Sequence, residues 1–423
     1  MRNASLWRAL LGVEDTVIED VEFDEDTELV VAHVRPRRPG RGRCGACGAR
    51  APWYDRGEGR RRWRGLDLGT LELWLEAEAP RVNCPTHGPT VRQVPWARHG
   101  AGHTYGFDQQ VAWLATQCSK TAITELMRIA WRTLGAIITR VWADTAGAAD
   151  LFAGLRRIGI DEISYKRGHR YLTVVVDHDS GRLVWAAPGR DKATLGLFFD
   201  ALEASGEGRS AQITHVSADG ADWISGVVAE RCPNAVRCAD PFHIVRWATD
   251  ALDEVRRQAW NEARGAVAQR RAGRARGHAK TLKHARYALW KNPENLTTRQ
   301  QAKLAWVAKT DPRLHRAYLL KEGLRVVFQL PHEEAGEALE VWIGWARRCR
   351  IPAFVDLQRK IVKHRDSILA AIEHGLSNGR IESVNTKIRL ITRVAFGFRS
   401  PQALIALAML SLGGYRPILP GRN

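Results

Sequence analysis

Three acidic residues that are far apart in the sequence, Asp161, Asp219 and Glu382, each lie within a polar motif of their own. Carboxylate oxygens are hard ligands that favour Mg²⁺ or Mn²⁺. Two such ions about 3.5 to 4 Å apart can activate a water molecule or a 3′-hydroxyl group and stabilise the leaving oxygen of an in-line phosphoryl displacement. If the fold brings the three acids together, they predict a divalent-metal site for phosphoryl transfer.

Strand periodicity places the first acid. Residues 157–164 alternate apolar side chains with others, which predicts a strand on which Asp161 and Glu162 face opposite ways. The C-terminal end of this strand would present Asp161. Asp161, rather than Glu162, is therefore the candidate metal ligand.

The segments that follow predict a sheet and its helices in the order β-β-β-α-β-α-β-α. The turn at 178–181 favours a hairpin between the second and third strands. In this order the ends of the first and fourth strands can lie side by side at the sheet centre, which would bring Asp161 and Asp219 within reach of shared ions. The expected fold is a ribonuclease-H-like catalytic sheet. Further strands are expected over 171–177, 182–187, 212–219 and 235–240, and helices over 193–202, 223–230 and from Pro241 onward.

A predicted helix carries the third acid. It opens with Ser377 and Asn378, which are good N-cap residues. Glu382, Asn385 and Arg389 fall on one polar stripe, so that a single helix face could offer a metal ligand, a hydrogen-bonding amide and a phosphate contact above the sheet. The adjacent apolar stripe, at helical spacing, consists of Ile381, Val384, Ile388 and Ile391.

Other acids compete for these roles. An isolated aspartate after a strand is more often a helix cap or a turn former than a metal ligand. Asp240 is the main rival of Asp219, because it also ends a predicted strand and it precedes His243, which could orient a carboxylate. Asp240 could replace or assist Asp219. Asp177 and Asp179 are expected to be turn residues.

Taken in order, these motifs resemble those of the ISL-three (ISL3) family of bacterial insertion-sequence transposases, which use a triad of two aspartates and one glutamate called DDE. The resemblance extends to the N-terminal cysteines and covers nearly the whole chain. It implies that Asp161, Asp219 and Glu382 are catalytic, that Arg389 and Arg393 contact DNA, and that ends freed by hydrolysis as 3′-hydroxyls are transferred into target DNA. It is carried by Gly159 to Glu162, Ser217 to Gly220, Ala239 to His243 and Ser377 to Asn385, followed by Arg393, Gly397 and Phe398.

Two knuckles near the N-terminus, Cys44 with Cys47 and Cys84 with His87, predict a structural zinc site. Three thiolates and one imidazole complete a tetrahedral zinc shell with no open position. A Cys44–Cys47 disulfide is the alternative, although the other four cysteines are scattered singly and the sequence shows no signal peptide. His99 or His103 could replace His87 as the fourth ligand.

Helical patterns between about residues 107 and 142, with turns around Ser119 and Ala130, predict a helix-turn-helix. Its recognition helix would begin near Trp131 and present Arg132, Thr133 and Arg140 to the major groove of DNA. A helical packing or dimerisation unit is the alternative.

The composition agrees with a nucleic-acid partner, since 64 Lys and Arg against 46 Asp and Glu give a net charge of +18. No segment approaches the roughly 20 apolar residues of a membrane span. We therefore expect no membrane partner and a cytoplasmic protein that acts at the nucleoid. The stretch 256–286 holds ten Lys or Arg and one acid, Glu262, so it either binds DNA or forms a solvated surface.

The expected layout is a multidomain α/β chain in which a zinc ribbon and a helix-turn-helix precede a catalytic sheet with a long helical insertion. The segments are an accessory hairpin (1–43), the zinc ribbon (44–103), the helix-turn-helix (104–150), the first part of the catalytic core (151–248), the insertion (249–376) and C-terminal core helices that carry Glu382 (377–423).

The expected partners are the double-stranded terminal repeats and target DNA, and pairing of two ends implies at least a homodimer. Two other functions share parts of the pattern. A metal-dependent nuclease or resolvase would use the same acids without joining DNA. A domesticated, non-catalytic regulator would use the zinc ribbon and the helix-turn-helix alone.

Overall fold

The computed structural model describes residues 3–37, 42–268 and 272–422. The chain forms two compact units. One contains Met1–Ala149 together with Ile391–Asn423, and the other contains Asp150–Leu390. The middle of the basic stretch 256–286 lies outside the described residues, and its role as a DNA contact stays a prediction.

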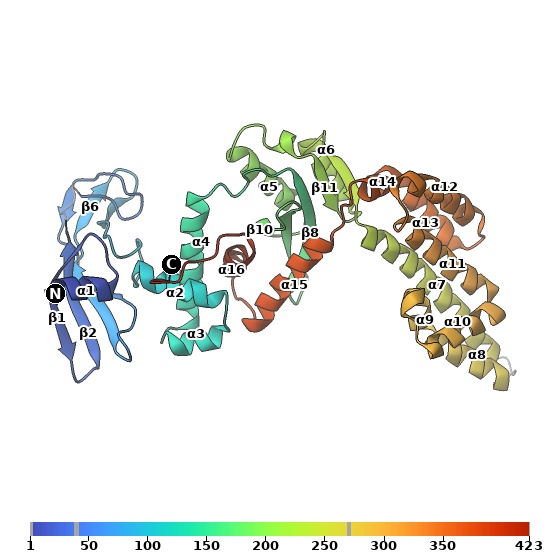
Figure 1. The fold of residues 1–423 in the computed structure, drawn as a ribbon, viewed down its shortest axis with the longest axis horizontal. Helices are drawn as coiled ribbons and strands as arrows, with labels where there is room; N and C mark the ends of the chain where they lie inside the picture. Colours follow the sequence, from blue (N-terminus) through green and yellow to red (C-terminus); the bar gives the residue numbers. More distant parts are fainter. Residues whose placement is uncertain (1–2, 38–41, 269–271, 423) are drawn as a thin grey trace. The chain divides into compact units, whose positions relative to one another are not determined.

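In the first unit a four-stranded sheet has the order β1-β2-β5-β4 (Figure 1). Its strands are β1 (Thr16–Asp24), β2 (Leu29–Pro36), β4 (Arg60–Arg64) and β5 (Glu72–Glu78), and α1 (Asn3–Leu11) precedes them. β1 and β2 form the expected hairpin, and β2 pairs in parallel with β5. The N-terminal hairpin and the segment after the first cysteines therefore share one sheet. A second sheet, β3-β6-β7, consists of β3 (Trp53–Asp55), β6 (Arg81–Cys84) and β7 (Gly88–Val91).

Three helices follow in the same unit: α2 (Tyr105–Ala115), α3 (Lys120–Leu126) and α4 (Trp131–Ala148). The side chains of Thr104 and Ser119 cap α2 and α3. The C-terminal helix α16 (Pro401–Leu412) packs against α4. Seven of its twelve residues are buried, so this apolar segment belongs to the core of the first unit.

The second unit contains a five-stranded sheet of order β10-β9-β8-β11-β12. β8, β9 and β10 pair antiparallel, whereas β8, β11 and β12 run parallel. As expected from the sequence, the first strand of this sheet lies beside the fourth. The strands are β8 (Arg157–Lys166), β9 (Arg170–Asp177), β10 (Leu183–Pro188), β11 (His215–Ala218) and β12 (Val236–Ala239).

Two helices, α5 (Lys192–Ala204) and α6 (Asp222–Arg231), cover one face of this sheet. Their apolar side chains pack on Ile158, Ile160 and Val216. The expected strand over 212–219 is shorter than predicted, because residues 210–212 form a 3-10 turn (η1, Ser210–Gln212) and the strand ends before Asp219. Asp219 therefore lies just beyond the end of β11.

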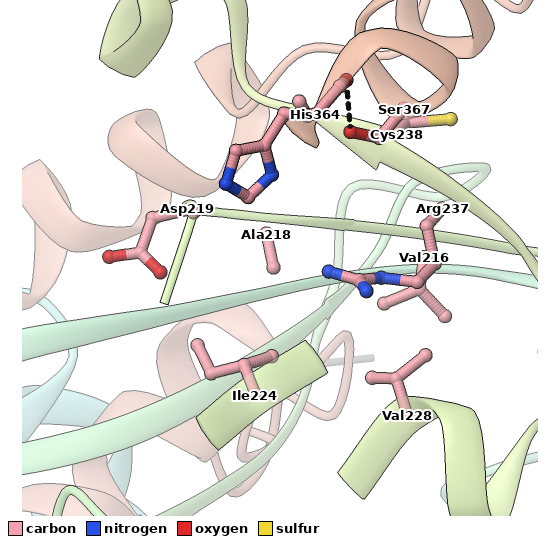
Figure 2. Close-up of a pocket in the computed structure, with 11 residues that line it drawn as sticks. Val216, Ala218, Asp219, Ile224, Val228, Arg237, Cys238, His364 and Ser367 are labelled. Carbon is pink, nitrogen blue, oxygen red and sulfur yellow. Dashed lines mark hydrogen bonds between the residues drawn. The ribbon is translucent and has the colours of Figure 1, made fainter. Parts of the chain in front are cut away.

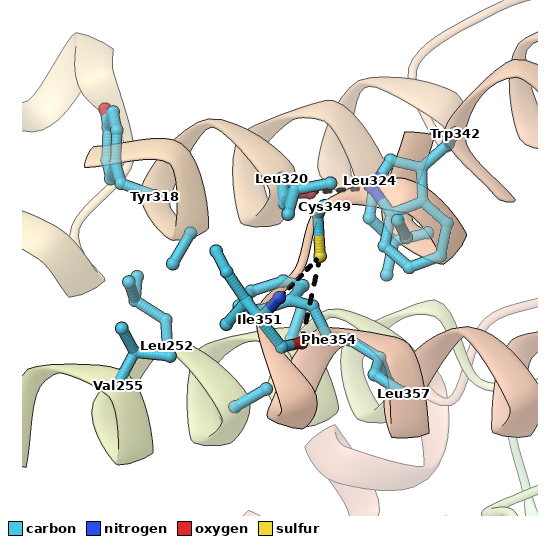
Figure 3. Close-up of a cluster of buried hydrophobic side chains, with 14 of the residues drawn as sticks. Leu252, Val255, Tyr318, Leu320, Leu324, Trp342, Cys349, Ile351, Phe354 and Leu357 are labelled. Carbon is cyan, nitrogen blue, oxygen red and sulfur yellow. Dashed lines mark hydrogen bonds between the residues drawn. The ribbon is translucent and has the colours of Figure 1, made fainter. Parts of the chain in front are cut away.

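A long helical segment separates β12 from the end of the unit (Figure 1). One apolar core holds most of it together, and Figure 3 shows its centre, where α7, α11, α12 and α13 meet. Trp342 donates its indole N–H to the carbonyl of Leu320 over 2.7 Å, so its ring is buried without losing its polar partner. The helices are α7 (Pro241–Ala268), α8 (Ala272–His284), α9 (Arg286–Trp290), η2 (Pro293–Asn295), α10 (Thr298–Thr310), α11 (Pro312–Val327), α12 (His332–Arg348), α13 (Pro352–Lys363), α14 (Arg365–Glu373) and α15 (Gly379–Val394).

Candidate functional site

Asp161 and Asp219 lie at neighbouring positions of the second unit's sheet. In the parallel pairing of β8 with β11, Ile160 is opposite Ala218, so each aspartate directly follows a paired residue. Asp161 Oδ1 accepts the backbone N–H of Glu162 at 2.7 Å, and Asp219 Oδ1 accepts that of Ala221 at 3.1 Å. The two predicted ligands thus lie at neighbouring positions on adjacent strands. The prediction that the C-terminal end of the first strand presents Asp161 is wrong, because β8 continues past it to Lys166, where it pairs with the start of β9.

The helix α15 reaches the same place. Asn385 Nδ2 donates to Asp161 Oδ2 over 2.7 Å. Glu382 is exposed and lies one turn before Asn385 on the same helix. In the part of the chain that the structure describes, the side chains of the three acids do not form a group whose ligand atoms all lie within 4.8 Å of one another. Asn385 therefore links the Glu382 helix to Asp161 without bringing all three acids together.

The carboxylates at this end of the sheet influence one another. Burial raises the pKa of Asp161, and the negative charges of Asp219 and Asp240 raise it further, while His243 opposes them. Burial also raises the pKa of Glu162 to about 7, although Arg190 donates to this carboxylate over 2.8 Å. An oxygen-rich site with mutually repelling carboxylates fits a hard divalent cation, which Asp161 and Asp219 would hold with Glu382.

Glycine at position 159 permits the close approach of α15 to the sheet. A Cβ atom at Gly159 would lie 2.7 Å from Cγ1 of Ile381, closer still to Cδ1, and 2.8 Å from His178 Nε2. Real Cβ atoms essentially never come that close to other heavy atoms. Ile381 precedes Glu382, so this contact sets the height of Glu382 above β8.

A chain of buried hydrogen bonds fixes the start of α15. Ser217 Oγ donates to Asn378 Oδ1 at 2.7 Å and lies 2.7 Å from His178 Nε2. Because the hydroxyl hydrogen of Ser217 is used on Asn378, His178 must donate its Nε2–H to Ser217 Oγ. Burial, with the nearby charges of Arg380 and Arg157, lowers the pKa of His178 to about 4, so the ring is neutral near pH 7. Arg380 also donates to the carbonyl of His178.

Asp240 continues this chain rather than standing alone beside Asp219. Its Oδ1 accepts the backbone N–H groups of Asn378 and Phe242, both at 3.3 Å, and its Oδ2 lies 2.6 Å from His243 Nδ1. The hydrogen bond from His243 to Asp240 raises the pKa of His243. Asp240 is only 2% exposed. With both oxygens engaged, it is placed to support α15 and to orient His243.

The insertion contacts the loop that follows Asp219. Figure 2 shows Asp219 beside a small pocket into which Ile224 and Val228 project, with the His364 ring close by.

A Cβ atom at Gly220 would lie 2.6 Å from Cζ2 of Trp247 on α7. Lys360 of α13 lies over the same ring, with Nζ 3.4 Å from its centroid. Helices far away in the sequence thus pack directly behind this aspartate.

The predicted zinc ligands Cys44, Cys47, Cys84 and His87 do come together, in the first unit. Their ligand atoms all lie within 4.8 Å of one another. Cys47 Sγ is 3.7 Å from Cys84 Sγ, and His87 Nδ1 is 3.7 Å from Cys44 Sγ and 3.6 Å from Cys84 Sγ. A tetrahedron with Zn–S bonds of about 2.3 Å has edges of about 3.8 Å, so the four side chains fit a structural Zn²⁺.

The alternatives at this site do not hold in the structure. Cys44 and Cys47 are free cysteines, so they form no disulfide. His103 stacks on Phe107 and lies 3.9 Å from Asp108, outside the zinc cluster. His99 also lies outside it.

The helices α2, α3 and α4 place the predicted DNA-contacting residues differently. Arg132 is exposed and Thr133 is half-buried at the start of α4. Arg140 instead pairs with the fully buried Asp108, with Nη2 3.2 Å from Oδ1. The side chain of Arg98 joins the same carboxylate at 3.0 Å. Arg140 therefore helps to neutralise a buried acid between α2 and α4, whereas Arg132 faces solvent.

Sequence analysis gave no role to several residues that the structure places in these contacts. His178 was assigned only to a turn, Ser217 was noted only as part of a motif, and Asn378 was predicted only as an N-cap residue. A serine inside a buried strand is a usable signal, because a buried hydroxyl needs a partner. The partner itself, 161 residues away, could not be found from one sequence.

Comparison with known proteins supports the same assignment. The ISL3-type DDE transposase model matches residues 158–408, a model described as the helix-turn-helix domain of transposase family ISL3 matches 92–142, and one described as the zinc-finger of transposase IS204/IS1001/IS1096/IS1165 matches 40–87. The chain is 68% identical over 442 residues to the transposase for insertion sequence element IS1557 from two strains of Mycobacterium tuberculosis, covering all of this chain and 98% of the relative. It is 25% identical over 406 residues to the transposase for IS1001 of Bordetella parapertussis, covering 95% and 96%.

A zinc ribbon, a helix-turn-helix and a catalytic domain of this kind, in this order, define a DDE-type transposase. The chain belongs to the ISL3 family of insertion-sequence transposases. The family resemblance predicted from the sequence is thereby confirmed. Among the described helices, none combines the length and the apolar character that crossing a bilayer requires.

Proposed function

We propose that the chain binds the terminal repeats of its insertion sequence, cleaves DNA at the element ends and transfers the freed 3′-hydroxyl ends into target DNA. The observation that carries this proposal is the placement of Asp161 and Asp219 directly after the last residues that pair β8 with β11, with Asn385 of the Glu382 helix bonded to Asp161. The sheet order with its central parallel pair supports a ribonuclease-H-like fold for the catalytic domain.

Asp161, Asp219 and Glu382 are the residues proposed to hold Mg²⁺ or Mn²⁺. When bound, these ions supply activation of the attacking oxygen and stabilisation of the leaving oxygen. Asn385 orients the Asp161 carboxylate by donating to Oδ2, while Oδ1 accepts the backbone N–H of Glu162. Arg389 is exposed one turn beyond Asn385, where it can bind a DNA phosphate.

The end-recognition part of the proposal rests on the first unit. Arg132 and Thr133 at the N-terminal end of α4 are the groups that would enter the major groove. Arg393, exposed in the last turn of α15, is proposed to contact the DNA backbone. Since two ends must be processed in one event, we propose that the active form is at least a homodimer.

The test uses purified protein, Mg²⁺, duplexes that carry the ends of the neighbouring genomic element and a supercoiled plasmid target. We expect joined products from the wild type, and neither cleavage nor joining from Glu382→Gln, Asp161→Asn or Asp219→Asn, while each variant still binds the end duplexes. Any variant that cleaves at the wild-type rate removes its residue from the site. Cleavage without joining by the wild type would indicate a nuclease, and binding alone would indicate a regulator.

A further inference from the structure

The hairpin of β8 and β9 carries a second concave site. Its lining residues come from the ends of β8 and β10 and from the start of β9, and the cleft has a volume of about 350 Å³. That volume is within the range of pockets that take small ligands or single groups of larger ones. We call it the hairpin cleft, lined by Tyr165, His169, Arg170, Tyr171, Pro188, Gly189 and Arg190.

The hairpin cleft combines aromatic rings with positive charges. The guanidinium of Arg190 lies 4.8 Å from the centroid of the Tyr171 ring, and the His169 ring is stacked beside Tyr171 at 6.4 Å. Arg170 is exposed at the rim, and none of the lining residues is acidic. Guanidinium groups bind phosphates, and aromatic rings accept the faces of nucleobases. This combination suits a nucleic-acid strand.

The hairpin cleft and Asp161 belong to the same pair of strands, β8 and β9. The cleft lies where β8 and β10 end and β9 begins, whereas Asp161 lies in the middle of β8, nearer the end of β11. Tyr171 comes three residues before Val174, the cross-strand partner of Asp161. At about 3.3 Å per strand residue this is roughly 10 Å along the sheet. Because the offset from Val174 is odd, the side chain of Tyr171 is on the same face as Glu162, opposite to that of Asp161.

One side chain connects the two sites. Glu162 follows Asp161 on β8 but faces the side of the sheet that α5 covers, and its Oε2 accepts from Arg190 Nε over 2.8 Å. Arg190 thus lines the cleft while it pairs with the neighbour of a proposed metal ligand. A DNA strand that lies along Asp161 would pass the tip of the β8–β9 hairpin before one of its nucleotides entered the cleft.

We propose that the hairpin cleft binds an unpaired nucleotide of the DNA strand being cut, with a phosphate on Arg170 and a base on Tyr165. The inference rests on the proposed function, because the cut strand is the ligand. The nucleotide is unpaired, because bases in a duplex are stacked on one another and offer no free face to a tyrosine ring. A paired duplex would engage only the cations.

Binding of the full-length protein to two DNAs tests this site: a blunt duplex of the element end, and the same duplex with an unpaired segment of three or four nucleotides near the cleavage position. Ca²⁺ replaces Mg²⁺ so that binding is measured without cleavage. The variants are Tyr165→Ala, Tyr165→Phe and Arg170→Ala. The matched control is Lys309→Ala, which removes an exposed charge from α10 of the same unit. Thermal unfolding verifies that each variant is folded.

We expect Tyr165→Ala to weaken binding of the unpaired DNA about tenfold and to leave the blunt duplex unchanged, while Tyr165→Phe retains affinity because the ring remains. Arg170→Ala should lower the slope of log K against log salt by about one, as expected for one lost phosphate contact. Lys309→Ala should match the wild type on both DNAs.

Two results would overturn the proposal: Tyr165→Ala binding unpaired DNA as tightly as Lys309→Ala does, or equal losses on both DNAs, which would show a backbone contact only. The readout is independent of catalysis. If the wild type joins no ends but Tyr165→Ala weakens binding of unpaired DNA, the proposed transposition mechanism is refuted and the proposal for the hairpin cleft stands. If the wild type joins ends but Tyr165→Ala does not change binding of unpaired DNA, the proposed mechanism stands and the proposal for the hairpin cleft is refuted.

Discussion

Replacement of Gly159 by alanine tests whether the contact between α15 and β8 controls the position of Glu382. The new Cβ would lie 2.7 Å from Cγ1 of Ile381 and 2.8 Å from His178 Nε2, against an ordinary carbon–carbon separation of about 3.5 to 4.0 Å. Relief of that overlap requires α15 or β8 to move by about 1 Å. Overpacking of this kind costs about 1–3 kcal/mol of stability.

The catalytic effect should exceed the effect on stability. A displacement of about 1 Å in a catalytic group can cost about a hundredfold in rate, and Glu382 directly follows the displaced Ile381. We therefore expect Gly159→Ala to remain folded, to bind element ends like the wild type, and to cleave them about a hundredfold more slowly. Urea unfolding and single-turnover cleavage of an end duplex measure the two effects.

A second substitution identifies the cause. Ile381→Ala removes both carbons that the new Cβ would approach, so adding it to Gly159→Ala should recover part of the lost rate; the contact with His178 keeps the recovery partial. The control is Gly196→Ala in α5, where a Cβ meets nothing within 4 Å. Full activity of Gly159→Ala would refute the docking argument, and so would a double variant with no recovery.

Four further outcomes are expected. Asn378→Ala removes the acceptor of Ser217 and should lower unfolding free energy by about 1–3 kcal/mol and slow cleavage without weakening end binding; slower cleavage with unchanged stability would contradict the buried bond. Chelation should release one zinc ion per chain and abolish binding to element ends, and Cys84→Ser should likewise lose zinc and end binding. A purified protein that contains no zinc would refute the proposed zinc site. The pKa of His178 is about 4 in the folded protein and about 6.5 in the unfolded chain, so the neutral ring contributes its full stability above pH 6.5 and that contribution is lost as the pH falls toward 4. His178→Gln should therefore weaken the dependence of the unfolding free energy on pH between 6.5 and 4. An unchanged dependence would count against a buried neutral ring. Arg132→Ala should weaken end binding more than nonspecific binding, and an equal loss on both would mean that it touches only the backbone.

Local patterns in the sequence were enough to predict the elements around the acids. The alternation in β8 correctly separated Asp161 from Glu162, and the stripe on α15 correctly placed Asn385 toward the sheet, because both depend on fixed periodicities of strand and helix. The two zinc knuckles were equally clear, since ligand spacing constrains the chain locally.

Long-range partners were not predictable from those patterns. Nothing in the alternation of β2 indicates that it pairs in parallel with β5. The charge of Arg140 suggested a DNA contact, but Asp108, 32 residues earlier, takes its guanidinium. Pairings of this kind depend on which surfaces meet in three dimensions, and a single sequence records only that a charge or an apolar face is present.

The same limit applies to the C-terminal end. The sequence predicts that residues 377–423 complete the catalytic core, and the transposase family match extends to residue 408. By compactness, however, Ile391 onward groups with the N-terminal unit. The apolar pattern of α16 indicates burial without saying against what. Only the packing of α16 on α4 supplies the answer.

That packing affects when the protein can first bind DNA. The unit that contains the helix-turn-helix is built from both ends of the chain, and α16 supplies a fully apolar surface against α4. During synthesis, α4 is made long before α16, so its apolar face has no cover until the last residues leave the ribosome. Lys120 of α3 then contacts the carbonyl of Gly397 and the ring of Phe398, which closes the unit. We therefore expect the helix-turn-helix unit to complete its packing only after the last helix has been made, and a copy truncated just before α16 to keep α15 but to leave the apolar face of α4 uncovered.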